Sequence, residues 1–149
     1  MSAQLLQPAD AFATGCVMIS VRGEQGRPRV VWARAFNSVS LTPAIVVWVL
    51  RSDDADSLEM GRACGISVVA GTQCDGAAPT ARLMQWQPGE ILGAPLATYS
   101  LASFEAVVID RIDCGEEIVH FAQLASFAKC ATESDCVCFD GRLVPSRQL

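Results

Sequence analysis

One stretch of small polar side chains forms a candidate binding segment. Residues 36–43 read Phe-Asn-Ser-Val-Ser-Leu-Thr-Pro and directly precede the strongly apolar run at residues 44–50. Hydroxyl and amide groups beside an apolar strand would offer hydrogen bonds to the polar edge of a planar ligand and an apolar floor beneath its ring. The same residue types also dominate ordinary loops for backbone reasons, so the segment alone leaves a binding site and a simple connection as alternatives.

Metal-binding and nucleophilic sites have weaker support. The one histidine, His120, lies in an apolar, strand-like run, which favours a satisfied, non-functional side chain. Cys136 and Cys138 would face the same side of a strand, yet no second cysteine pair or histidine cluster completes the four ligands of a structural zinc site. Cys74, which we expect to be the most exposed cysteine, shows no base that could activate it as a nucleophile. We therefore predict no metal site.

Composition and motifs exclude several classes of function. Phosphate loops, nucleophile elbows, zinc-protease helices and the GxGxxG fingerprint are absent from the sequence. The net charge of -5 argues against nucleic acid as a partner, because such proteins carry a basic stripe. The longest apolar run, at residues 44–50, is far shorter than the about 20 residues that span a bilayer. Because the first residues lack the basic region of a secretory signal, we expect a cytoplasmic protein with free thiols.

The elements that must position the polar segment are mainly β-strands. Strand-forming runs occur at residues 16–21, 29–33, 44–50, 66–70, 105–110, 117–124 and 136–140. Residues 22–28 join the first two as a hairpin, and the run 44–50 suits a strand that is buried on both faces. Two short helices are predicted, one over residues 11–13 and one from residues 52–57 to about Cys64, with Gly65 as its stop. The short connections predict a mostly-β, six- or seven-stranded, Greek-key-like barrel with short peripheral helices.

Length and hydrophobic content bear on domain organisation and assembly. A chain of 149 residues provides one domain, so we assign residues 1–149 to a single unit with its barrel core at about residues 12–143. With 51% hydrophobic residues, the chain carries more apolar side chains than one small barrel can hide. A large exposed apolar patch usually marks an interface, and we therefore expect a homodimer.

Several ordered landmarks resemble the flavin reductase-like, FMN-binding split-barrel family. Its members carry a segment close to Ala-Asn-Ser-Phe-Thr-Ser-Val-Ser-Leu-Asp-Pro-Pro, which this chain matches at Ala33, Phe36, Ser38, Val39, Ser40, Leu41 and Pro43. Further similar stretches follow in the family's order, at residues 12–15, 66–73, 95–96, 101–105 and 138–143. The resemblance covers nearly the whole chain and implies a split barrel.

The resemblance also implies a dimeric flavoprotein, with FMN, or FAD as the alternative flavin, near the subunit interface. The flavin would take hydride from NADH or NADPH and pass it to free flavin or another acceptor, such as a flavin-dependent monooxygenase component. By the same resemblance, Ala35, Phe36 and Asn37 would face the pyrimidine rim of the ring, Ser38 and Ser40 would lie near the ribityl chain or phosphate, and Arg51, Ser52 and Ser57 would help to hold the phosphate. Arg34, which is not part of the family pattern, would be a second cation for that phosphate.

Three departures from the family pattern bear on activity. Arg34 and Ala35 replace the usual Asn-Ser, and residues 52–57 carry three carboxylates near a position where many members keep a lysine. Glu117 occupies the histidine position of the family's Gly-Asp-His, and a carboxylate cannot act there as an imidazole donor at neutral pH. On a regular strand, His120 would face away from Glu117. Two hypotheses follow: a flavin-dependent NAD(P)H oxidoreductase, or a non-catalytic split-barrel homodimer that binds flavin or another ligand.

Overall fold

The architecture is dominated by strands. The computed structural model describes residues 14–15, 17–69, 85–98, 100–129, 136–139 and 142–145, and within these ranges helical structure is limited to the 3-10 turns η1 (Glu24–Gly26) and η2 (Ser52–Ser57). The main sheet is built from β2 (Val17–Arg22), β3 (Pro28–Ala33), β4 (Ala35–Leu41), β5 (Ala44–Arg51), β6 (Ala63–Val69), β9 (Ser100–Asp113) and β10 (Glu117–Lys129). The mostly-β fold class is confirmed.

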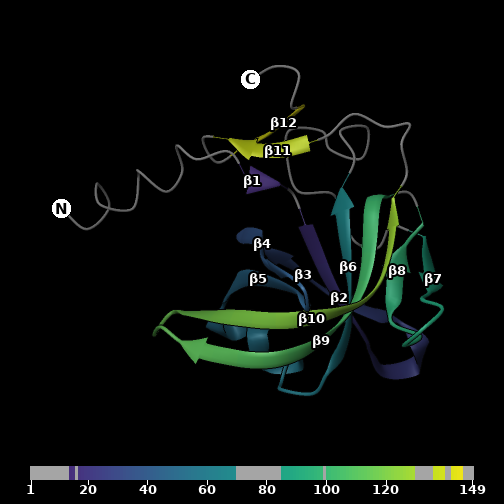
Figure 1. Cartoon of the computed structure of the whole chain (residues 1–149), viewed down its shortest axis with the longest axis horizontal. Coiled ribbons are helices and arrows are strands. Elements are labelled where there is room, and N and C mark those ends of the chain that lie inside the picture. Colours follow the sequence, from purple (N-terminus) through teal and green to yellow (C-terminus); the bar gives the residue numbers. More distant parts are fainter. Residues whose placement is uncertain are drawn as a thin grey trace.

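The main sheet is antiparallel and strongly curled. Its strand order is β3-β2-β6-β9-β10-β5-β4, and Figure 1 shows β9 and β10 as a long curved hairpin across the molecule. Two small sheets accompany it: one pairs β7 (Trp86–Pro88) with β8 (Pro95–Ala97), and the other joins β1 (Thr14–Gly15), β11 (Cys136–Phe139) and β12 (Arg142–Pro145). Within the described ranges, no helix has the length and apolar character needed to cross a bilayer.

The two edges of the curled sheet are joined in the chain at Arg34, which we call the seam. Ala33 pairs with Val17 on one side of the sheet, whereas Ala35 pairs with Val49 on the other. Arg34 lies between them and donates its backbone N–H to the carbonyl of Val49 at 2.9 Å. The two edge strands, β3 and β4, are therefore consecutive in the chain, and this single residue carries the chain from one edge to the other.

Alternation along β5 divides the core from the outside of the barrel. Val46, Trp48 and Leu50 are fully or almost fully buried, whereas Val47 and Val49 on the opposite face are only half-buried. The prediction that this strand is buried on both faces is therefore wrong for the single chain. Because strands with one covered face show this alternation, the outer face of β5 is left with apolar side chains near water.

The other expected elements meet with mixed results. The hairpin over residues 22–28 is confirmed as the η1 connection between β2 and β3, and the polar segment forms strand β4 rather than a loop. The helix predicted to run to about Cys64 is wrong: η2 ends at Ser57, and Cys64 and Gly65 lie in β6. The helix expected at residues 11–13 lies outside the described residues.

A buried carboxylate fastens the loop between β7 and β8 to the barrel. Glu105 is fully buried, and it accepts hydrogen bonds from the backbone N–H groups of Ile91, Leu92 and Ala94 and from the hydroxyl of Ser126 at 2.8 to 3.2 Å. Burial alone would raise the pKa of Glu105, but these hydrogen bonds outweigh it and hold the pKa below its ordinary value. The ionised side chain is thus the form that holds this loop.

Candidate flavin site on the outer face

The exposed side of β4, β5 and β10 forms an apolar floor, which we call the outer face. Direct cross-strand partners point to the same side of a sheet, so the pairing register shows which residues share the outer face. Val47 lies between Asn37 and Phe121, and Val49 lies between Ala35 and Val119. The valines and Phe121 are half-buried in the single chain. Val47, Val49, Val119 and Phe121 carry no signal in the sequence that distinguishes them from ordinary strand residues.

A β-bulge adds a polar rim to this floor. The register between β4 and β5 shifts between Ser38 and Ser40, so that Ser40 pairs with Ile45, whose neighbour two residues on is Val47. Ser40 therefore shares the outer face with Asn37. In a regular strand, residues on one face are two positions apart, and the bulge adds one residue between these two. Asn37 is exposed, and its side-chain oxygen accepts a hydrogen bond from the Ser38 backbone N–H at 2.9 Å.

Two predicted flavin contacts lie on the opposite side of β4. Phe36 pairs with the buried Trp48, and its ring packs toward the core with its centroid 6.3 Å from that of Phe104. Ser38 pairs with the buried Val46 and is itself exposed. The structure therefore brings Ala35, Asn37 and Ser40 to one face and directs Phe36 and Ser38 to the other.

Charged groups gather at one end of the outer face. Glu117 begins β10 and is the direct cross-strand partner of Arg51, the last residue of β5. The Arg34 guanidinium forms an ion pair with the Glu117 carboxylate. The backbone N–H of Ser52 donates to the Glu116 carbonyl at 2.9 Å, which fixes the start of η2 beside the tip of the β9–β10 hairpin. Arg34, Arg51, Ser52 and Glu117 thus lie together, although the sequence separates them widely.

The predicted phosphate contacts do not all converge. Ser40 is opposite Ile45, at the other end of β5 from Arg51, which corresponds to roughly 20 Å along a strand. Ser57 ends η2, and its hydroxyl is buried with no hydrogen-bond partner in the described part of the chain. One phosphate group can therefore meet either the charged end with Arg51 and Ser52 or the rim at Ser40, but not both.

His120 lies on the core side of β10, away from Glu117 as expected. It is fully buried and stacks on Trp48, its cross-strand partner, with ring centroids 5.6 Å apart. Neither ring nitrogen has a hydrogen-bond partner among the described residues, so the expectation of a satisfied histidine is wrong. Burial, with a smaller contribution from the guanidinium of Arg111, lowers the pKa of His120 to about 4.

This buried histidine predicts loss of stability in mild acid. Above about pH 6.5 it is neutral in both states, but between pH 6.5 and about 4 only the unfolded chain takes up its proton. Folding stability should therefore fall by on the order of 3 kcal/mol as the pH drops across this range. Urea unfolding at successive pH values measures the slope. His120→Phe keeps an aromatic ring against Trp48 and should flatten it; an unchanged slope would assign the acid sensitivity to other groups.

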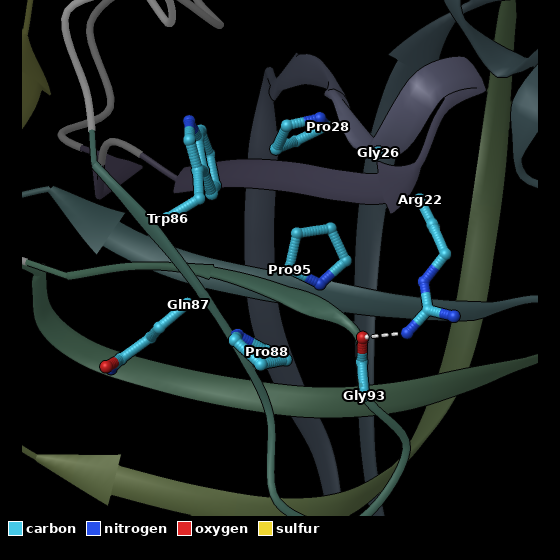
Figure 2. Close-up of a pocket in the computed structure, with 8 residues that line it drawn as sticks. All are labelled: Arg22, Gly26, Pro28, Trp86, Gln87, Pro88, Gly93 and Pro95. Carbon is cyan, nitrogen blue, oxygen red and sulfur yellow. Dashed lines mark hydrogen bonds between the residues drawn. The ribbon is translucent and has the colours of Figure 1, made fainter.

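A separate cleft lies at the β7–β8 hairpin, away from the predicted site residues. Its volume is about 190 Å³, and Figure 2 shows the Trp86 indole and the rings of Pro28, Pro88 and Pro95 lining it. At its edge, Arg22 donates a hydrogen bond to the Gly93 carbonyl at 2.9 Å. None of the binding or catalytic residues predicted from the sequence lines this cleft.

Cysteines and metal ligands add no second centre to the described part of the chain. Cys64 and Cys114 are free, and burial raises the pKa of the Cys64 thiol to about 12, which makes it an inert core side chain. The described residues contain no group of three or more His, Cys, Asp or Glu side chains that could hold a metal ion. Cys74 lies outside the described residues, so its expected exposure stays a prediction.

The donor set of the outer face fits a flavin. An isoalloxazine ring has two apolar faces and one edge of carbonyl and nitrogen groups. The valine rows match a face, and the amide and hydroxyl groups of Asn37 and Ser40 match the edge. Arg51 at the charged end is exposed and makes no ion pair with any other described residue, which leaves it able to meet a phosphate.

Comparison with known proteins points the same way. The family model of the flavin reductase like domain matches residues 9–143. A probable flavin reductase of Rhizobium meliloti (strain 1021) is 28% identical over 126 residues, which cover 78% of this chain and 40% of that protein, so the chain spans less than half of this relative's length.

Solved structures share the split-barrel fold. BorF, the flavin reductase component of a bacterial two-component tryptophan halogenase, is 27% identical with a TM-score of 0.79, and the match covers 99% of this chain and 100% of BorF. The NADH:FAD oxidoreductase SgcE6 of Streptomyces globisporus C-1027, solved with NAD and FAD fragments, is 22% identical with a TM-score of 0.80, and the match covers 96% and 91% of the two chains.

Proposed function

The chain belongs to the flavin reductase like domain family, and from this membership we propose that it is an FMN-dependent oxidoreductase that passes reducing equivalents from NADH or NADPH to free flavin or another acceptor. The observation that carries the proposal is the outer face, where an apolar floor of β5 and β10 adjoins the amide and hydroxyl rim of β4. BorF is a flavin reductase component and SgcE6 is an NADH:FAD oxidoreductase, which supports the same chemistry here.

Each part of the outer face has a definite task in this proposal. Asn37 and Ser40 would donate to and accept from the polar edge of the ring, while Val47 and Val49 would cover one face and exclude water. Arg51 and Ser52 would hold the phosphate. The bound flavin supplies the hydride-accepting chemistry, and the chain contributes position and charge.

Reduction of flavin by a pyridine nucleotide is the direct test. The purified protein is mixed with FMN under anaerobic conditions, and NADH or NADPH is added while the flavin absorbance is followed. We expect bleaching at a rate well above that of the protein-free mixture. Parallel titrations with FMN and FAD measure the flavin preference. Binding without bleaching would favour the non-catalytic alternative, which one observation supports: Glu117 is already engaged by Arg34.

Adjacent residues on opposite faces of β4 locate the flavin. Asn37→Tyr adds bulk to the outer face and should reduce FMN affinity by at least about tenfold, because the ring can no longer reach its floor. Ser38→Tyr adds the same bulk to the other face and should have a much smaller effect. Fluorescence quenching of FMN gives both affinities. The reverse ranking would place the ring on the side of Ser38 and Phe36.

Assembly and partners complete the proposal. The half-buried outer face and the exposed Val39 and Leu41 at the end of β4 support a homodimer that buries this surface beside the flavin. A flavin-dependent monooxygenase or halogenase component is the proposed consumer of reduced flavin, by analogy with the two-component system named for BorF. The free thiols of Cys64 and Cys114 suit a cytoplasmic protein.

A further inference from the structure

The Arg34–Glu117 ion pair connects two segments that the fold brings together across β5. Arg34 lies at the seam between β3 and β4, and Glu117 begins β10. In the sheet order β10-β5-β4, β5 separates them, so the guanidinium must reach over the end of β5 to meet the carboxylate. Arg51, the cross-strand partner of Glu117, lies at the same end.

The arrangement places one carboxylate where two arginines can reach it. A carboxylate and a phosphate present similar oxygen pairs to a guanidinium group. Glu117 therefore pairs with the Arg34 guanidinium in the way that a bound anion would. Among the described residues at this end of the outer face, an incoming phosphate meets one unpaired cation, Arg51, and one cation that is already paired, Arg34.

We propose that Glu117 is an internal competitor for Arg34, which a phosphate-bearing ligand displaces when it binds at the charged end of the outer face. The inference rests on the proposed function, and it makes the pair a determinant of specificity for phosphorylated over unphosphorylated ligands. The phosphate can come from the flavin or from a pyridine nucleotide. Glu117 lowers the affinity for that phosphate as long as it is negatively charged and near Arg34.

Exposure makes this exchange energetically accessible. The side chains of Arg34 and Glu117 are 57% and 39% exposed, and ion pairs of such exposure are weak, worth at most about fivefold in an equilibrium constant. A phosphate that approaches Arg34 and Arg51 together makes stronger, charge-assisted hydrogen bonds. The displaced carboxylate keeps a cationic neighbour, because Arg51 is its cross-strand partner.

Ligands that differ by one phosphate test the proposal. Glu117→Gln should tighten FMN binding about two- to fivefold, the range that an exposed pair allows, and leave riboflavin binding unchanged. Glu116→Gln removes an equal charge from the neighbouring residue without touching the pair, so it is the matched control and should change FMN affinity less. In an Arg34→Gln background, Glu117→Gln should lose most of its effect. A corresponding comparison of NADPH with NADH shows whether the 2′-phosphate of the nucleotide is the group that binds there.

Three results would overturn the proposal: equal changes for FMN and riboflavin, an equal effect of Glu116→Gln, or an undiminished effect without Arg34. A titration with inorganic phosphate, followed through the NMR signal of the Arg34 Nε–H, separates this idea from the proposed function. The signal should shift with phosphate, and at lower phosphate concentration in Glu117→Gln. A protein that binds no flavin but shows this shift would refute the proposed function and retain the competition, whereas an unshifted signal would refute the competition.

Discussion

Replacing Glu105 with alanine is expected to lower the free energy of unfolding by about 3 to 5 kcal/mol, among the largest losses that a single residue of this fold can cause. The carboxylate accepts three backbone N–H groups and one hydroxyl in a fully buried position. Removing it leaves the N–H groups of Ile91, Leu92 and Ala94 without partners. Urea unfolding of both proteins at pH 7 measures the loss.

Two further variants serve as controls for Glu105→Ala. Glu90→Ala removes a carboxylate from an exposed position in the same loop and should change stability by less than about 0.5 kcal/mol. Glu105→Gln keeps the shape but replaces one acceptor by a donor, so it should fall between the two. Because the folded pKa of Glu105 is depressed, its contribution is present above the ordinary glutamate pKa and is lost as the pH falls below it. A loss under about 1 kcal/mol for Glu105→Ala would mean that the loop holds without its anchor.

Replacing Gly65 with valine should be comparably damaging. A Cβ atom at this position would lie 1.9 Å from the Pro95 carbonyl oxygen and 2.8 Å from the Ser20 hydroxyl oxygen, so β6 and β8 could not keep their present approach. The Ser20 hydroxyl also donates to that carbonyl at 2.6 Å, and this bond would be displaced. We expect a loss of more than about 3 kcal/mol, measured by thermal and urea unfolding.

Gly115 provides the contrast for this variant. It lies in the β9–β10 turn with φ +89° and open space around its hypothetical Cβ, so Gly115→Ala adds a side chain at the cost of backbone strain alone. That cost should be about 1 kcal/mol. If Gly65→Val were no worse than Gly115→Ala, β8 would have to be able to move away from β6 at little cost.

Local patterns predicted the strands well because hydrophobic alternation and turn residues act over short distances. The hairpin at residues 22–28 and the strand at 44–50 are examples. The helix predicted to run from after Arg51 to about Cys64 does not form, and the reason is tertiary. Polar N-terminal residues favour helix there, but residues from Ala63 onward pair with β2 and β9 on both sides, and those two ladders outweigh the local preference.

The candidate site could be predicted only in part from the sequence. Asn37 and Ser40 were selected by their residue types, but their shared face depends on a bulge that no local signal marks. The contact between Arg34 and Glu117 depends on strand order alone. The apolar floor could not be predicted, because Val47 and Val49 have the residue type of core side chains. Only the curl of the sheet shows that they lie on its exposed side.

The seam gives ligand binding a mechanical consequence. Since the backbone of Arg34 joins the two edges of the sheet and its side chain meets the charged end of the outer face, the same residue takes part in two equilibria: local opening of the sheet at this point and capture of an anion. A ligand that engages Arg34 only while this part of the sheet is folded must lower the population of the opened form, by thermodynamic linkage. The exchange rate of the Arg34 backbone amide, which donates to the Val49 carbonyl, should then fall as the ligand concentration rises.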